Sequence, residues 1–382
     1  MLPGWLVERG VTEILVGKHR RMRACFRILI VTGCVCLMAV ALSQRPACAE
    51  TDLFSRPPSL EPQIKFWVDV FTAYSYRDFV IVDRDDPYKF YQVYHLPGDG
   101  PPNRDEIDWV NNYLKNKYSG ILMHLASGSE PMGDDERRVA DMYKGRSPYA
   151  LRLGADNLRV QEGLKERFRE GLLRSKYYRP TMEKIFKSAG LPVELVTLAQ
   201  VESGFERGAR SSAGALGIWQ FTRATGKHYM TIRGRHDDRL NPSLETQAAA
   251  KLLRYNYDTL GDWPLAITAY NYGTAGTARA AEASGSDYSK MLRNYNGPHF
   301  GFAVKNYYAE FLAALQVHQY EDKYFPGIES EPAIVPAPLP VYHASQHSAH
   351  LLQVAAPVRR HARHHGKKHH SRVATSRSQR DA

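Results

Sequence analysis

Cysteine is nearly absent from this 382-residue chain, because its only four cysteines all lie within the first 49 residues. The rest of the sequence therefore cannot form a disulfide bond, a thiol nucleophile or a cysteine-ligated zinc site. No internal repeat is present either.

An excess of positive charge is also absent from the central part, although the whole chain has a formal charge of +11. Lys and Arg outnumber Asp and Glu by seven to two in residues 1–49 and by eight to one in residues 333–382. Between these ends, 36 basic residues face 37 acidic ones. Such a body has no broad field for phosphates, so nucleic acid is not an expected partner. The 43% hydrophobic content fits a globular protein and excludes disorder throughout.

The first 49 residues have the pattern of an export signal. A basic stretch at 18–27 precedes an apolar run at 28–42, and Ala47-Cys48-Ala49 follows as a small-x-small cleavage site. This predicts an exported, periplasmic protein whose mature chain begins at residue 50. Two alternatives remain open, both of which imply membrane association. The apolar run, about 15 residues long, could stay uncleaved as an anchor, and Val31-Thr32-Gly33-Cys34 weakly resembles a lipoprotein cleavage box.

Residues 50–154 form an N-terminal region of mixed α/β character and unknown role. β-branched and aromatic residues at 79–82 and 88–94 flank a turn-like segment at 83–87, which predicts a β-hairpin. Apolar residues at helical spacing predict a helix over 103–127. No chemical motif occurs here, so packing or partner contact is the expected role.

Residues 155–325 read as helical almost throughout, which predicts a mainly α fold. One expected helix carries an apolar stripe of Val160, Leu164, Phe168 and Leu172, and a second begins near Pro192. A third opens at Asn241-Pro242 and is striped by Leu244, Ala248, Leu252 and Tyr255, and the last spans about 302–320. Residues 326–382 are rich in His and Arg and are expected to be a disordered tail, with weak attraction to anionic envelope polymers as one role for it.

Glu202 stands out because a carboxylate rarely lies on the apolar stripe of a helix. It follows Leu195 and Leu198 by seven and four residues, so a continuous helix places all three on one face. Burial beside a helix-ending Gly204 is expected to raise its pKa and keep it protonated near neutral pH, as a general acid requires. The alternative is a structural glutamate, buried and hydrogen-bonded to nearby donors.

Two further segments combine small residues, aromatic rings and amides. The first runs from Ser211 to Gln220, where glycines allow close approach of a flat ligand, Trp219 offers a stacking face and Gln220 offers an amide. The second is Ala269-Tyr270-Asn271-Tyr272-Gly273. Aromatic faces beside hydroxyls and amides suit neutral sugars. The alternative for each segment is ordinary helix packing.

Together these motifs resemble those of the lytic murein transglycosylases. Glu202-Ser203-Gly204-Phe205, Gly214-Ala215-Leu216-Gly217-Ile218-Trp219-Gln220 and the Tyr270 segment occur in the family's order. The Trp-Gln form, with the upstream stretches Arg159-Val160-Gln161-Glu162-Gly163 and Arg167-Phe168, is similar to the membrane-bound D-type branch.

The resemblance implies that residues 155–325 are a goose-lysozyme-like catalytic domain. Glu202 would be the single catalytic acid/base, and Tyr307 would lie beside it, with Tyr308 as the rival assignment. The residues implied in substrate binding are Ser203, Ser211, Gly217, Trp219, Gln220, Tyr270, Asn271 and Tyr307. The chain departs from the family in two ways: a His/Arg-rich tail replaces the D-type cell-wall-binding repeats, and the motif around Tyr307 lacks a proline that relatives carry.

A second catalytic carboxylate is not evident near Glu202. Glu206 lies in a polar loop and is interpreted as solvated, while Asp237, Asp238 and Asp262 occupy loop or capping positions. Because an ordinary glycosidase needs two carboxylates, the simplest hypothesis is a non-hydrolytic reaction on peptidoglycan strands that gives a 1,6-anhydromuramic product. It implies no metal and no other cofactor. The alternatives are a hydrolytic muramidase and a glycan-binding scaffold without turnover.

Overall fold

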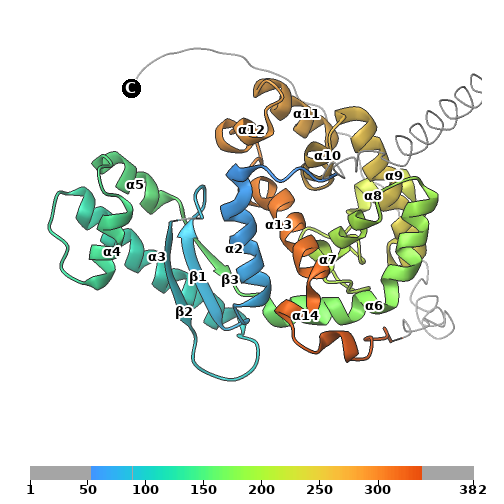
Figure 1. The fold of residues 1–382 in the computed structure, drawn as a ribbon, viewed down its shortest axis with the longest axis horizontal. Helices are drawn as coiled ribbons and strands as arrows, with labels where there is room; N and C mark the ends of the chain where they lie inside the picture. The colour runs from blue at the N-terminus through green and yellow to red at the C-terminus, as the bar shows by residue number, and fades with distance from the viewer. Residues whose placement is uncertain (1–52, 88, 338–382) are drawn as a thin grey trace, which may run out of the picture. The chain divides into compact units, whose positions relative to one another are not determined.

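The computed structural model describes residues 53–87 and 89–337 (Figure 1). The predicted export signal and nearly all of the predicted tail lie outside these residues. The helices are α2 Glu61–Thr72, α3 Arg104–Ala126, α4 Asp134–Met142, α5 Pro148–Asp156, α6 Lys165–Ser188, α7 Leu198–Ser203, α8 Arg223–Tyr229, α9 Pro242–Leu260, α10 Trp263–Tyr272, α11 Thr274–Ala283, α12 Tyr288–Asn294, α13 Phe302–Gln319 and α14 Glu321–Tyr324. Short 3₁₀ helices are η1 Pro58–Leu60, η2 Val193–Thr197, η3 Asp238–Leu240 and η4 Ile328–Ser330. The strands are β1 Asp78–Asp83, β2 Phe90–His95, β3 Leu158–Glu162, β4 Ile232–Arg233 and β5 His236–Asp237.

This content confirms the prediction of a mainly α protein with a small sheet in its N-terminal part. None of the described helices is both long enough and apolar enough to span a membrane.

The N-terminal part contains a three-stranded sheet in the order β2-β1-β3. Strands β1 and β2 pair antiparallel, which confirms the predicted hairpin. Strand β3 pairs antiparallel with the other edge of β1. The prediction that Val160 begins a helical stripe is therefore wrong, because Val160 lies in β3 opposite Ile81. Gly163 then brings the chain so close to the carbonyl of Ser75 that a Cβ there would lie 2.2 Å from it, and α6 begins only at Lys165.

The predicted helix over 103–127 is confirmed as α3. Its first turn is closed by a capping box, in which Asn103 and Glu106 each accept a hydrogen bond from the other's backbone N–H. Apolar residues of α3, including Leu114 and Leu122, pack with β1 and with the short helices α4 and α5 in a small core of their own. This part of the chain lies to the left in Figure 1.

A larger core unites α2 with the helices that follow β3. Helix α2 packs along α13 and contacts α6, as Figure 1 shows in the centre of the molecule. The Trp67 indole N–H of α2 donates to the Asn306 side-chain oxygen of α13 at 3.1 Å. The N-terminal region thus supplies one helix to the core of the predicted catalytic domain, and the division at 154/155 stays a prediction.

Helix α9 begins where the Asn241-Pro242 pair predicts, since the Asn241 side chain accepts hydrogen bonds from two backbone N–H groups of the first turn. Its predicted stripe is only half right. Ala248 and Leu252 are buried, but Leu244 is 37% exposed and Tyr255 is 54% exposed. The buried face is rotated toward small residues because α9 packs closely against α6 and α10.

Residues 326–337, the first part of the predicted disordered tail, are instead packed against α6. Ile328 is completely buried. The Ile334 backbone N–H donates to the Leu173 carbonyl, and the Lys176 ammonium donates to the Ile328 carbonyl. Burial of Ile328 and these hydrogen bonds to α6 account for the difference, whereas Ile334 and Val335 stay exposed.

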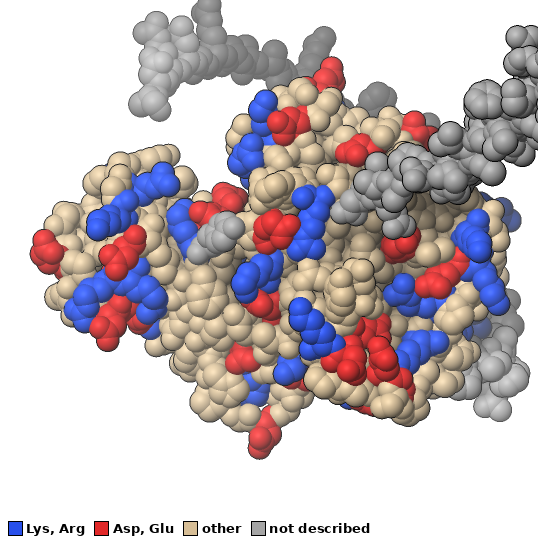
Figure 2. Space-filling view, in the orientation of Figure 1, with Lys and Arg blue, Asp and Glu red and all other residues tan. Residues whose placement is uncertain are grey.

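Basic and acidic side chains alternate over the face of the molecule shown in Figure 2. That distribution fits the near balance of basic and acidic residues in the central part of the sequence.

Candidate active site

Glu202 lies in the last turn of α7. The 3₁₀ helix η2 runs directly into α7, and Gly204 ends α7 with a φ of +60°, a left-handed conformation that glycine adopts easily. Leu195 and Leu198 are fully buried on this segment. Glu202 itself is only partly buried, so its carboxyl group faces a cleft while its backbone is fixed by the core.

Tyr307 of α13 points its hydroxyl group at this carboxyl group. The phenol donates a hydrogen bond to Glu202 Oε1 at 2.5 Å, and only 4% of the Tyr307 surface is exposed. The neighbouring Tyr308 points elsewhere and donates to the carbonyl of Ser55. Of the two rival tyrosines, the structure thus brings Tyr307 to the glutamate.

The environment of Glu202 holds its pKa at about 7, because burial raises it more than the hydrogen bond from Tyr307 lowers it. Near neutral pH the group therefore exists both as an acid and as a carboxylate. Both forms are required of a residue that gives a proton and later takes one.

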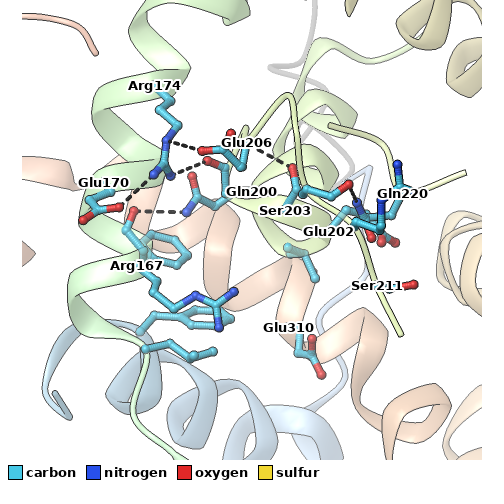
Figure 3. Close-up of a pocket in the computed structure, with 17 residues that line it drawn as sticks. Arg167, Glu170, Arg174, Gln200, Glu202, Ser203, Glu206, Ser211, Gln220 and Glu310 are labelled. Atoms are coloured by element: carbon cyan, nitrogen blue, oxygen red, sulfur yellow. Dashed lines mark hydrogen bonds and ion pairs between the residues drawn. The ribbon is translucent and has the colours of Figure 1, made fainter. Parts of the chain in front are cut away.

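Two cavities meet at Glu202. The first has a volume of about 540 Å³ and the second about 760 Å³. Three predicted site residues line both, namely Glu202, Ser211 and Gln220. The two cavities therefore form one cleft that passes the carboxyl group. Figure 3 shows the residues that line the first cavity.

The second cavity is lined by aromatic and neutral polar residues. Tyr270 and Asn271 both line it, as the family resemblance implies. The Tyr270 hydroxyl donates to the Trp219 carbonyl at 2.9 Å, which ties α10 to the loop of residues 204–222. Asn271 is exposed, so its amide is free to face a ligand.

Three predicted binding residues line the cleft while also shaping that loop. Ser203 donates to the Ile218 carbonyl at 2.8 Å, and the Ser211 hydroxyl accepts from the Ala215 backbone N–H at 3.0 Å. The Gln220 amide donates to the Gly217 carbonyl at 2.8 Å. Their hydrogen bonds fix the loop conformation that forms the cleft wall.

Trp219 and Gly217 do not reach the cleft, so the predicted ligand contacts of both are wrong. Trp219 has no exposed surface; it stacks on Phe186 of α6 and donates its indole N–H to Thr246 of α9. Gly217 is buried with a φ of +88°, and a Cβ there would lie 2.0 Å from the Arg239 carbonyl oxygen. Both residues anchor the loop to the core.

Glu245 was missed by the sequence reasoning. It lies on the buried face of α9, and its carboxyl group accepts hydrogen bonds from the backbone N–H groups of Ile218 and Trp219, each at 3.2 Å. Burial raises its pKa well above the usual range. The sequence shows a helix start at Asn241-Pro242, but nothing in it indicates that a loop more than twenty residues earlier supplies the donors.

Glu310 is the second missed residue, and it lines the same cavity as Glu202 (Figure 3). It follows Tyr307 by one turn of α13. Burial and the charge of Glu202 raise its pKa to about 8, against the opposing charge of Arg159. Among the described residues, its side chain has no hydrogen-bond or ion-pair partner within 4 Å. Glu310 is therefore a second carboxyl group that is partly buried and unpaired in the cleft, and the sequence reasoning did not expect it.

The carboxylates weighed at the sequence level have other surroundings. Glu206 is exposed and forms an ion pair with Arg174 at 3.2 Å, which confirms the interpretation of a solvated loop residue. Asp237 caps η3, and Asp262 occupies the capping position before α10. Asp238 accepts from the backbone N–H of Thr231. Within the described part of the chain, no group of three or more His, Cys, Asp or Glu side chains is placed to hold a metal ion.

Residues 181–292 match the family model of the transglycosylase SLT domain. This segment is similar to the SLT domain. Glu202 and both cleft segments lie within the match, whereas Tyr307 and Glu310 lie beyond it. The match confirms the resemblance to the lytic transglycosylases that the motifs indicate.

Similar proteins cover only parts of the chain. Over 100 residues it is 38% identical to the membrane-bound lytic murein transglycosylase D of Escherichia coli, which is 26% of this chain and 22% of that protein. Over 92 residues it is 36% identical to a putative tributyltin chloride resistance protein of Alteromonas sp., covering 24% and 44%. The chain thus spans less than half the length of these relatives.

Among solved structures, the 70 kDa soluble lytic transglycosylase of Escherichia coli matches with a TM-score of 0.33 and 17% identity. That match covers 57% of this chain and 34% of the other. The goose-lysozyme-like description of residues 155–325 stays an expectation of the motifs and the SLT match.

Proposed function

We propose that the protein is a peptidoglycan lytic transglycosylase that cleaves the β-1,4 bond between N-acetylmuramic acid and N-acetylglucosamine. The observation that carries this proposal is Glu202: a carboxyl group with a pKa of about 7, held by Tyr307, where two cavities meet in an SLT domain.

The proposed reaction uses Glu202 twice. Its protonated form gives the proton to the bridging oxygen as the bond from that oxygen to C1 of the muramic residue breaks. The carboxylate then takes the proton of the muramic 6-hydroxyl group, whose oxygen forms a bond to C1. The product is a 1,6-anhydromuramic end, and no water is consumed. The acetamido group of the substrate can hold C1 between these steps, as in substrate-assisted glycosidases.

Tyr307 supports the second half of this sequence. Its hydroxyl donates to the oxygen that carries negative charge once Glu202 has given up its proton. A donor to the charged form stabilises it. The hydrogen bond therefore lowers the cost of leaving a carboxylate in a partly buried site.

A hydrolytic muramidase is the second candidate, and Glu310 is the observation that favours it. Glycosidases that use water place a second carboxylate across the bond from the acid, and Glu310 is a second carboxyl group in the same cavity. In that reaction the ionised form of Glu310, which is the minor form at neutral pH because its pKa is about 8, would take a proton from water, and the product would have an ordinary reducing end.

Mass spectrometry of soluble products from purified sacculi distinguishes these reactions, with Glu202→Gln as the matched variant. Muropeptides lighter by one water than their reducing-end counterparts, absent with the variant, are expected from a transglycosylase. Reducing-end products would establish the hydrolase, and Glu310→Gln should then abolish them. If sacculi were bound but no product formed, the protein would be a glycan-binding scaffold.

We also propose that the protein works in the periplasm, where peptidoglycan strands are its partner. This placement depends on the export signal read from residues 1–49, and export of a fusion to a reporter that is active only outside the cytoplasm tests it. Weak association of residues 338–382 with anionic envelope polymers stays a prediction, because these residues lie outside the described part of the chain.

A further inference from the structure

The two cavities that meet at Glu202 differ in charge. The second is lined by neutral residues and one histidine, with Glu202 as its sole acidic residue. The first is lined by three arginines and several glutamates in addition to Glu202. The arginines are Arg167, Arg174 and Arg210. Because the glycan backbone itself is uncharged, sugar binding does not explain why the first cavity is lined by charged residues and the second is not.

One of the three arginines is fully occupied within the protein. Arg174 forms ion pairs with Glu170 at 2.7 Å and Glu206 at 3.2 Å, and it donates to the Gly204 carbonyl (Figure 3). Its charge is therefore neutralised, and its role is to hold the end of α7.

The other two arginines are available to a ligand. Arg167 in the first turn of α6 and Arg210 in the loop of residues 204–222 are both exposed. Among the described residues, neither side chain has an ion pair or a hydrogen bond. Burial raises the pKa of Glu162, and the charge of Arg167 opposes that rise only in part. Figure 3 shows Arg167 extending from α6 into the side of the cavity where Glu310 lies. Two elements thus present one guanidinium each to one end of the cleft.

The carboxyl groups that share this cavity offset these charges only in part. Arg174 pairs with both Glu206 and Glu170, which leaves one negative charge on these three side chains. Burial holds the pKa of Glu310 at about 8, so Glu310 is largely uncharged at neutral pH. When Glu202 is protonated as well, three guanidinium groups face two carboxylates, and the first cavity keeps one positive charge in excess.

We propose that Arg167 and Arg210 bind carboxylates of the peptide stem that muramic acid carries, and so make the protein specific for stem-bearing strands. This inference rests on the proposed function for the identity of the polymer. Stem peptides are the part of peptidoglycan with free carboxylates, and a guanidinium binds a carboxylate with two parallel hydrogen bonds. The stem would then lie on the α6 side of Glu202, and the second cavity would hold neutral sugar.

The test compares a double variant with a charge-matched control. Arg167→Gln with Arg210→Gln removes both cleft charges, while Arg146→Gln with Arg152→Gln removes two exposed charges that line neither cavity. The substrates are sacculi and sacculi whose carboxylates have been converted to methylamides. Binding is measured by co-sedimentation, with Glu202→Gln in every protein so that no turnover occurs.

Unchanged sacculi are expected to bind the parent protein about three- to tenfold more tightly than amidated sacculi, since exposed ion pairs contribute modestly. The cleft variant should bind both substrates equally, and the control should keep the preference. Added salt should also reduce the preference of the parent. Equal binding of both substrates by the parent, or a preference that survives in the cleft variant, would overturn the proposal.

Failure of this inference is distinguishable from failure of the proposed function. If the unmodified protein forms no anhydro product but its binding depends on carboxylates and on the two arginines, the reaction is wrong and the inference stands. If anhydro products form while binding ignores the stem carboxylates, the reaction stands and the inference falls.

Discussion

The hydrogen bond from Tyr307 to Glu202 can be tested by replacing Tyr307 with Phe, which removes one oxygen and keeps the ring in its buried site. In the proposed reaction Glu202 must be protonated at the start, so activity is expected to fall as the pH rises past its pKa of about 7. The phenol donates to the charged form and therefore lowers this pKa. Its removal should move the basic limb of the pH–rate profile upward.

The size of the shift follows from the strength of the bond. A hydrogen bond to a charged group contributes about 1.5–3 kcal/mol, and one pKa unit corresponds to about 1.4 kcal/mol. The basic limb should therefore move up by about one to two units. The same energy is lost where the carboxylate forms during the reaction, so the maximal rate should fall about ten- to a hundredfold.

The assay is the pH dependence of kcat/KM, which reports the ionisation of the free enzyme, measured by release of soluble glycan from sacculi. Tyr308→Phe is the matched control, because its hydroxyl donates to Ser55 and not to Glu202. We expect the control to keep the basic limb near its original pH. A limb that moved downward in Tyr307→Phe, or an equal shift in both variants, would refute the assignment of this hydrogen bond to the ionised carboxyl group.

Three substitutions and one control test how the loop of residues 204–222 is anchored, each measured by the free energy of unfolding in denaturant. Gly217→Ala should cost at least about 2 kcal/mol, because the new methyl group would lie 2.0 Å from the Arg239 carbonyl oxygen at a positive φ. Gly214→Ala, also at positive φ but in open space, should cost less, and equal losses would contradict the crowding argument. Trp219→Ala should lose about 3–5 kcal/mol, whereas a ligand-stacking tryptophan would lose affinity with little change in stability. Glu245→Gln should lose about 1–3 kcal/mol, since an amide offers one acceptor to two backbone donors; unchanged stability would exclude that role.

The sequence predicted the parts of the site that local pattern controls. Glu202 could be found because a short stretch of sequence is enough to show an acidic residue on an apolar helix stripe next to a glycine, and that combination is unusual. The hairpin and the start of α9 were predictable for the same reason, since turn residues and the Asn241 cap act on their nearest neighbours.

Contacts between distant segments decided the features that the sequence did not predict. Val160 lies in a strand because β1 offers it a free edge, and helical spacing alone does not reveal that edge. The local sequence around Trp219 is compatible with an indole that stacks on a sugar and with one that packs in the core. Its contacts with Phe186 and Thr246, which belong to two other helices, place it in the core. No sequence pattern around Glu310 indicated that it lies in the cleft, because its position there depends on how α13 packs against α7.

Helix α13 connects the site to the N-terminal region through three consecutive residues. Asn306 accepts from Trp67 of α2, Tyr307 donates to Glu202, and Tyr308 donates to Ser55 just before α2. Because consecutive helical residues point about 100° apart, contacts on both neighbours of Tyr307 fix the rotation of α13 about its axis. The segment from Ser55 to α2 thus helps to hold Tyr307 beside Glu202 without touching that carboxyl group, which gives part of the N-terminal region a structural role at the cleft.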